Sequence, residues 1–224
     1  MLEANKSRWF EKVFAVYNRN LLRRRFNSLR VCGLERLLKK KEAAAIIYVN
    51  HSAWWDGLIA FQISHRTKSD SFIMMEEKQL AKLFVFRNLG AFSVVRENPR
   101  EAKKSIDYAV KLLIEKPNRT LWIFPQGEIL PNDIRPLKFY GGLPRIIKKV
   151  ENCRVINLAM RYEFTGEFKP EIFVRLDETE LNASPADFDN KTLSKLLADR
   201  LTDNLACLKT DIINNRLTEY QNII

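Results

Sequence analysis

The sequence predicts an α/β fold: a single-domain sandwich in which helices flank a largely parallel central sheet. Short apolar segments of strand length alternate along the chain with segments of helical spacing. The strand-like segments are mostly apolar, which is typical of strands that are covered on both faces. The chain has 224 residues, 46% of them hydrophobic, and is therefore long enough for one substantial core.

The first predicted element is an amphipathic helix over residues 8–25. At helical spacing its large apolar residues gather on one side: Trp9, Phe10, Val13, Phe14, Tyr17 and Leu21. Its basic residues gather nearly opposite and continue into an arginine run: Arg8, Lys12, Arg19, Arg23, Arg24 and Arg25. This composition is typical of a helix that lies in a membrane interface, and a terminal helix packed on its own domain explains it equally well. We therefore divide the chain into a basic helical segment, residues 1–30, and a main domain, residues 31–224.

The elements of the main domain begin with a buried strand at residues 44–49, followed by a helix over residues 54–65. A second strand is expected at residues 93–95. Asn98, Pro99 and Glu101 then occupy N-cap, first-turn and capping-box positions of a helix that reaches Lys116.

The second half of the chain continues the alternation of strands and helices. Strands are expected at residues 120–124, 155–160 and 172–176, and a short helix at residues 143–150. A long C-terminal helix over residues 191–216 has leucines at helical spacing, which indicates packing rather than chemistry.

The chain is strongly basic, with 38 Lys and Arg against 27 Asp and Glu and a net charge of +11. This charge implies attraction to lipid headgroups, to nucleic acid or to an acidic partner. No apolar run approaches the ~20 residues that a membrane-spanning helix needs, and no signal peptide is recognised. We therefore expect a protein that is made and kept in the cytosol.

One of only two histidines, His51, directly follows the first buried strand of the main domain. Active-site residues of α/β folds lie at the carboxyl ends of strands. If His51 precedes the next helix and Asp56 lies in its first turns, the carboxylate can accept a hydrogen bond from one imidazole nitrogen and leave the other as a base. In the alternative interpretation, Ser52 or Asp56 only caps the helix and His51 has no role in chemistry.

Four ordered segments resemble the motifs of the glycerol-3-phosphate and lysophospholipid acyltransferase family. Asn50-His51-x-x-x-x-Asp56 resembles the family's H-x4-D block, and residues 90–96, GAFSVVR, resemble its second block. Residues 124–128, FPQGE, resemble the third block, usually F-P-E-G-T-R, and residues 155–160 resemble the last, apolar block. The resemblance implies an α/β sandwich that transfers a fatty acyl group from acyl-CoA or acyl carrier protein to a lipid hydroxyl.

The resemblance also implies roles for individual residues. His51 and Asp56 are the expected catalytic pair, and Arg96, Gln126, Gly127 and Glu128 are the expected acceptor-binding residues. Arg96 could instead be a surface residue or a structural ion-pair partner, and Glu128 a capping residue. Trp54 and Trp55 either line the acyl channel or pack in the core.

Two departures from the family pattern affect the acceptor. Gln126 and Glu128-Ile129 stand where the family usually has Glu and Thr-Arg, and Phe139-Tyr140-Gly141-Gly142 lacks the two cations of the common F-[KR]-[KR]-G pattern. A phosphate monoester would miss these charges, although Arg135 and Lys138 could lie near enough to replace them. The first expected acceptor is a lysophospholipid or 1-acylglycerol-3-phosphate, and the alternative is a glycolipid or a glycosylated terpenoid such as a carotenoid glycoside.

The predicted reaction is direct transfer in a ternary complex, because neither a G-x-S-x-G nucleophile motif nor a suitably spaced Cys-His pair is present. The thioester is a co-substrate, and neither a cofactor nor a metal is expected. The expected partners are acyl-CoA or acyl carrier protein, the lipid acceptor and an anionic membrane surface, with the protein peripheral on the cytoplasmic side. A nucleic-acid-binding protein that uses residues 23–25 and 39–41 is a remote alternative that explains none of the four segments, so no nucleic acid partner is expected.

Overall fold

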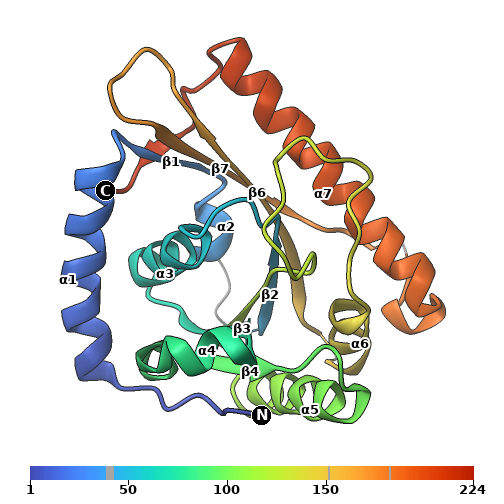
Figure 1. Cartoon of the computed structure of the whole chain (residues 1–224). Coiled ribbons are helices and arrows are strands. Elements are labelled where there is room, and N and C mark those ends of the chain that lie inside the picture. The colour runs from blue at the N-terminus through green and yellow to red at the C-terminus, as the bar shows by residue number, and fades with distance from the viewer. Residues whose placement is uncertain (39–42, 151, 182) are drawn as a thin grey trace.

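The computed structural model describes residues 1–38, 43–150, 152–181 and 183–224 and contains a single mixed sheet (Figure 1). The strands are β1 (Leu29–Cys32), β2 (Ala45–Val49), β3 (Asp70–Glu76), β4 (Ala91–Val94), β5 (Arg119–Ile123), β6 (Arg154–Glu163), β7 (Glu171–Glu178) and β8 (Gln221–Asn222). The α-helices are α1 (Arg8–Arg25), α2 (Glu35–Leu38), α3 (Asp56–Thr67), α4 (Glu77–Lys82), α5 (Pro99–Glu115), α6 (Gly142–Lys149) and α7 (Asn190–Ile213). Two short 3-10 helices are η1 (Phe84–Leu89) and η2 (Pro185–Asp187).

The sheet has the strand order β4-β3-β5-β2-β6-β7-β1-β8. The first five strands in this order run parallel to their neighbours. β7 pairs antiparallel with β6, β1 parallel with β7, and β8 antiparallel with β1. The predicted α/β fold with a largely parallel sheet is therefore confirmed, and the carboxyl ends of its parallel strands gather at one edge.

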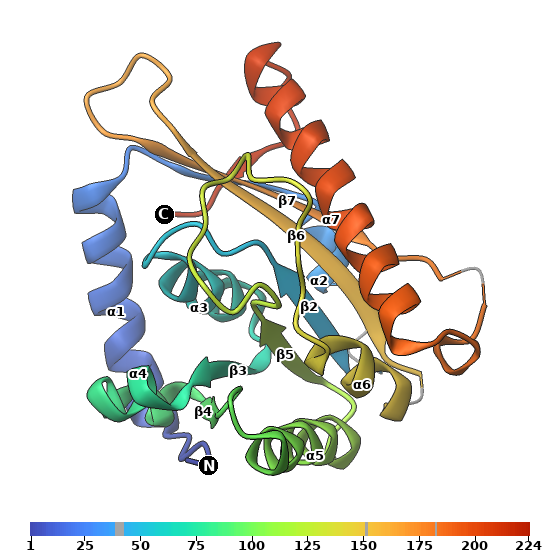
Figure 2. The same ribbon diagram turned by 45° about the vertical axis from the view of Figure 1, so that its right-hand side comes forward.

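Each face of the sheet is covered by helices, and the pleat of β2 shows how the core divides. Ile46 and Tyr48 face a cluster that includes residues of α5, α6 and α7, whereas Ala45, Ile47 and Val49 face residues of α1, α2 and α3. All five residues of β2 are buried. Figures 1 and 2 show α3 and α7 on opposite sides of the strands. Burial on both faces explains why the sequence of β2 is apolar throughout.

All the predicted helices and strands are present, with ends that differ by at most three residues. Asn98 accepts hydrogen bonds from the backbone N–H groups of Arg100 and Glu101, with Pro99 at the start of α5. The predicted helix at residues 54–65 begins instead at Asp56, because residues 50–55 form a loop. The described elements that the sequence pattern did not reveal are β1, α2, β3, α4, η1, η2 and β8.

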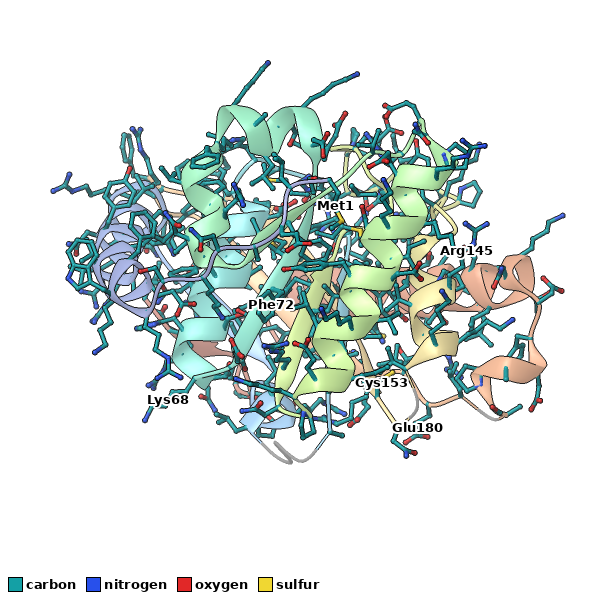
Figure 3. All side chains as sticks on the ribbon, turned by 90° about the horizontal axis from the view of Figure 1, so that it is seen from below. Met1, Lys68, Phe72, Arg145, Cys153 and Glu180 are labelled. Carbon is teal, nitrogen blue, oxygen red and sulfur yellow. The ribbon has the colours of Figure 1, made fainter. Side chains whose placement is uncertain are left out.

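The N-terminal helix α1 has the predicted bounds and packs on its own domain along one side, and its contact with a membrane stays a prediction. Asn18 is fully buried and donates from Nδ2 to the Leu58 carbonyl of α3 over 3.1 Å, beside buried Leu22. The opposite side remains open to solvent, with Trp9 72%, Val16 64% and Tyr17 58% exposed. Seen from below, α1 stands at the outer edge of the molecule with side chains pointing away from it (Figure 3).

The predicted boundary between the N-terminal segment and the main domain, at residue 30, falls inside β1. Within the described part of the chain, no helix is long and apolar enough to cross a bilayer. Lys39, Lys40 and Lys41 lie outside the described residues.

Candidate active site

His51 lies on the loop between β2 and α3, at the carboxyl edge of the sheet. The preceding residue, Asn50, is buried and pairs with Met160 of β6: its Oδ1 accepts from the Met160 N–H over 2.8 Å, and its Nδ2 donates to the Met160 carbonyl over 2.9 Å. These two hydrogen bonds to the neighbouring strand fix the position of the chain at the end of β2. They therefore also fix the position of the His51 backbone, which follows Asn50 directly.

Asp56, the first residue of α3, is completely buried and contacts His51 as predicted. Its Oδ2 lies 2.7 Å from His51 Nδ1 and accepts from the backbone N–H groups of Ser52 over 2.7 Å and Ala53 over 3.0 Å. A carboxylate also suits this place because the N-terminus of a helix favours negative charge. Asp56 thus pairs with His51, whereas the capping alternative is not realised: α3 has no side-chain cap, and the two N–H groups that donate to Asp56 belong to the loop before the helix.

Tyr162, near the end of β6, completes the surroundings of Asp56 and was not identified from the sequence. Its hydroxyl donates to the second carboxylate oxygen, Oδ1. Burial, and then the nearby carboxylate, raises the pKa of Tyr162 well above its ordinary value, so the phenol keeps its proton. Both oxygens of Asp56 are therefore held, and its orientation toward His51 is set by groups of the loop after β2 and of β6.

The segment that follows β5, residues 124–130, holds His51 from the other side. Gln126, 4% exposed, accepts from the His51 backbone N–H with Oε1 over 2.8 Å, and the Leu130 N–H donates to the His51 carbonyl over 2.8 Å. The Phe124 ring lies 4.7 Å from the imidazole, centroid to centroid. The structure thus brings Gln126 to His51 as the strand topology predicted. The Gln126 side chain is buried and does not line the cavity beside His51, so it holds the His51 backbone, and its role in acceptor binding stays a prediction.

The Gly127 N–H donates to the Phe124 carbonyl and closes a turn, which we call the Gly127 turn. This turn contacts Arg96, the arginine of residues 90–96. Arg96 Nη1 donates to the Gly127 carbonyl over 2.6 Å, its Nη2 lies 3.2 Å from the Glu76 carboxylate, and its guanidinium sits 5.0 Å from the centre of the Tyr140 ring. Arg96 is therefore held by three groups. Arg96 forms a structural ion pair, in which the Glu76 carboxylate balances its charge.

A cavity of about 470 Å³ opens beside His51. Its lining includes Trp54, Phe124 and Glu128, and also aromatic and aliphatic residues of α1, α3, η1 and the residue before η1: Phe14, Phe61, Leu83, Phe86 and Leu89. Phe14 meets Phe61 edge to face at a centroid distance of 5.0 Å. Trp55 does not line the cavity and instead packs on Phe26 of the core. The two tryptophans thus divide between the two roles considered for them.

The charged groups in the cavity wall are Glu76, Arg96, Glu128 and Arg145. Arg145 belongs to α6 and was not among the predicted site residues. Arg135 and Lys138 are absent from this wall, and Arg135 Nη1 donates to the backbone carbonyls of Asn132 and Ile134. Neither Arg135 nor Lys138 therefore supplies a cation to the cavity wall in place of the cations that the family pattern has at this site.

A comparison with models of protein families now identifies the chain. The model described as Acyltransferase, that of the glycerolipid acyltransferases, matches residues 28–161. The chain belongs to this acyltransferase family. It is accordingly an enzyme that transfers acyl groups. A search of the curated proteins gives no match.

The matched region of the acyltransferase begins just before β1 and ends one residue before Tyr162. It includes His51, Asp56, Arg96 and the Gly127 turn, whereas α1, which supplies Phe14 to the cavity, precedes it. The cavity of the acyltransferase is therefore completed by a segment outside the matched region.

We predict that Gly127→Ala destabilises the acyltransferase by about 1–3 kcal/mol, because of backbone strain and overpacking. Gly127 has φ +71°, and an added Cβ would meet the Arg96 guanidinium and lie 2.8 Å from Cε2 of Tyr140. Chemical denaturation measures the effect. Gly142→Ala is the matched control, because its Cβ meets nothing within 4 Å and the change should stay within about 1 kcal/mol of neutral. Equal unfolding free energies for the two variants would refute the tight packing around Gly127.

Proposed function

We propose that this acyltransferase moves a fatty acyl group from acyl-CoA or acyl carrier protein to a lipid hydroxyl, with His51 as general base. The observation that carries this proposal is the contact of 2.7 Å between His51 Nδ1 and a fully buried Asp56, beside an apolar cavity. A carboxylate at Nδ1 favours the tautomer in which Nδ1 holds the proton and Nε2 can accept one.

In the proposed reaction, His51 Nε2 takes the proton of the acceptor hydroxyl as its oxygen attacks the thioester carbonyl. Asp56 stabilises the imidazolium that forms. Collapse of the tetrahedral intermediate breaks the carbon–sulfur bond, and the imidazolium returns its proton to the departing thiolate. The products are an ester and a free thiol, and the reaction needs neither a metal nor a redox cofactor.

The lining of the cavity supports a fatty acyl substrate. Much of its wall consists of aromatic and aliphatic side chains, and apolar walls bind a hydrocarbon chain by removing it from water. We propose that the acyl chain lies against the part of the wall formed by Phe14, Phe61 and Phe86, with the thioester carbon beside His51. Phe14, from α1, then contacts the acyl chain directly.

The acceptor is the second part of the proposal, and the Arg96–Glu76 pair favours one of the two candidates. A lysophospholipid or 1-acylglycerol-3-phosphate would need an available cation for its phosphate. Two carboxylates, Glu76 and Glu128, and two cations, Arg96 and Arg145, lie in the same wall, and Arg96 is paired with Glu76. These contacts favour the alternative acceptor, a hydroxyl of a glycolipid or a glycosylated terpenoid, in which neutral hydroxyls meet carboxylates and amides.

We further propose that the enzyme works on the surface of a membrane, on its cytoplasmic side. The exposed side of α1 combines Trp9, Val16 and Tyr17 with flanking Arg8, Lys12 and Arg19. This arrangement suits an anionic lipid interface, into which the aromatic residues enter while the cations meet headgroups. Because Phe14 and Asn18 of the same helix face the interior, deletion of residues 1–25 would also open the cavity. Single substitutions on the exposed side test docking more cleanly.

We predict that His51→Ala lowers acyl transfer at least ~100-fold, the loss expected for a general base. Transfer of a labelled acyl group from a thioester to lysolipids and glycolipids, with product identification, measures the effect. His65→Ala is the matched control, because His65 stacks on Phe61 at a ring distance of 6.2 Å and has no part in the proposed proton transfer. Near-normal turnover of a folded His51→Ala enzyme would remove the catalytic assignment.

We predict that Tyr162→Phe lowers kcat about tenfold with little change in KM, because a hydrogen bond to a buried carboxylate contributes about 1.5–3 kcal/mol. Tyr48→Phe removes a buried tyrosine hydroxyl that bonds to Thr179 on the other face of the sheet. That control should lose some stability but keep its kcat. A Tyr162→Phe enzyme that loses stability alone would show that the tyrosine does not act through Asp56.

We predict that Glu76→Gln raises activity toward 1-acylglycerol-3-phosphate relative to a glycolipid, because it releases the charge of Arg96 toward the cavity. A charged hydrogen bond of about 1.5–3 kcal/mol corresponds to roughly a 10- to 100-fold change in relative kcat/KM. The panel of acceptors used for His51 measures this ratio. If the unmodified enzyme already prefers the phosphate monoester and Glu76→Gln leaves the ratio unchanged, the neutral-acceptor inference is wrong.

A further inference from the structure

The connection between β6 and β7, residues 164–169, exposes two aromatic rings. Phe168 is 97% exposed and Phe164 is 72% exposed. We call residues 164–169 the hairpin tip. Single exposed apolar residues are common on protein surfaces, but a ring that touches almost nothing of its own fold contributes no packing energy. The tip therefore offers apolar surface to something outside the chain.

The hairpin tip is joined to the C-terminal end of α1. Lys169 Nζ donates to the Arg23 carbonyl over 3.1 Å, and the Asn27 N–H donates to the Pro170 carbonyl over 3.0 Å. Figures 1 and 2 both show the tip projecting beyond this end of α1. The tip and the C-terminal end of α1 therefore lie on one side of the molecule.

The charges around the hairpin tip indicate the partner. Arg23, Arg24 and Arg25 are exposed in the last turn of α1, and Lys169 lies beside them. Glu167 is the acidic residue of the tip, so the cations of this region outnumber it. Aromatic rings that project beyond a cluster of cations fit a surface that is anionic at its face and apolar just below.

We infer that the hairpin tip is a second membrane anchor, which inserts Phe168 and Phe164 into an anionic lipid surface while Lys169 and residues 23–25 contact headgroups. This inference rests on the proposed membrane docking of α1 and extends it to a second, separate element. With two contacts along one side, the helix and the tip would orient the enzyme on the membrane instead of only attaching it.

The test measures binding of the full chain to vesicles of phosphatidylcholine, alone or mixed with phosphatidylglycerol. Phe168→Ala should lower the partition coefficient for mixed vesicles about tenfold, in line with the removal of one inserted ring. Ile114→Ala is the matched control: Ile114 is an exposed residue of α5, 64% exposed, and its loss should leave binding unchanged. Binding of Phe168→Ala equal to that of the wild type would overturn the inference.

Insertion is read directly with Phe168→Trp. The difference between its emission spectrum and that of the wild type should move to shorter wavelength on mixed vesicles and be quenched by brominated lipid, whereas the same difference for Ile114→Trp should not. A difference spectrum of Phe168→Trp that does not respond to vesicles would also overturn the inference. So would Phe168→Ala changing the self-association of the enzyme without lipid, because the tip would then meet a protein.

Failure of the proposed reaction is recognised separately from failure of the anchor. Phe168→Ala should transfer acyl groups to detergent-dispersed acceptor at the wild-type rate, since the hairpin tip lines no part of the cavity. If neither the wild type nor Phe168→Ala transfers acyl groups, but vesicle binding depends on Phe168, the membrane anchor is supported and the proposed reaction is refuted.

Discussion

The arrangement of the site depends on a carboxylate that is removed from water. Asp56 is completely buried, which is costly for a charged group unless hydrogen bonds replace its solvent. Its partners are His51 Nδ1, the backbone of Ser52 and Ala53, and the Tyr162 hydroxyl. Because these groups come from the loop after β2 and from β6, and Asp56 itself begins α3, satisfying one carboxylate fixes the relative positions of three elements. The imidazole that meets the cavity is oriented by the same requirement.

Sequence pattern revealed the parts of this arrangement that are local or wholly apolar. β2 and β5 are buried on both faces and show as apolar runs, and the loop placement of His51 follows from its spacing to Asp56. β3 was missed because it begins and ends with charged residues, Asp70 and Glu76, and is mostly half-buried. Tyr162 was missed because it lies 106 residues from Asp56. Strand register explains the contact: Val49, the last residue of β2, pairs with Leu158, so β6 continues past β2 and carries Tyr162 over the loop.

The charges of the cavity wall depend on long-range pairing in the same way. Arg96 was expected as an acceptor-binding cation, and that role stays a prediction. Its pairing with Glu76 could not be read from the sequence, because β3 itself was not recognised. The contact of Arg96 with the Gly127 carbonyl also ties it to the segment that holds His51. A cation that is balanced by a carboxylate and bonded to the backbone supports the loop geometry, and it offers less charge to a phosphate than an unpaired arginine would.

In the proposed reaction, Asp56 holds His51 with Nδ1 protonated, so that Nε2 is the base. Nitrogen-15 NMR of the two histidines, with His65→Ala used to assign His51, reads the tautomer directly. At a pH where His51 is neutral, we expect a protonated Nδ1 and an unprotonated Nε2, and Asp56→Asn should alter this distribution. A neutral His51 that carries its proton on Nε2 in the unmodified enzyme would refute the assignment of Nε2 as the base, because neither the contact with Asp56 nor the proposed proton transfer could then take place as described.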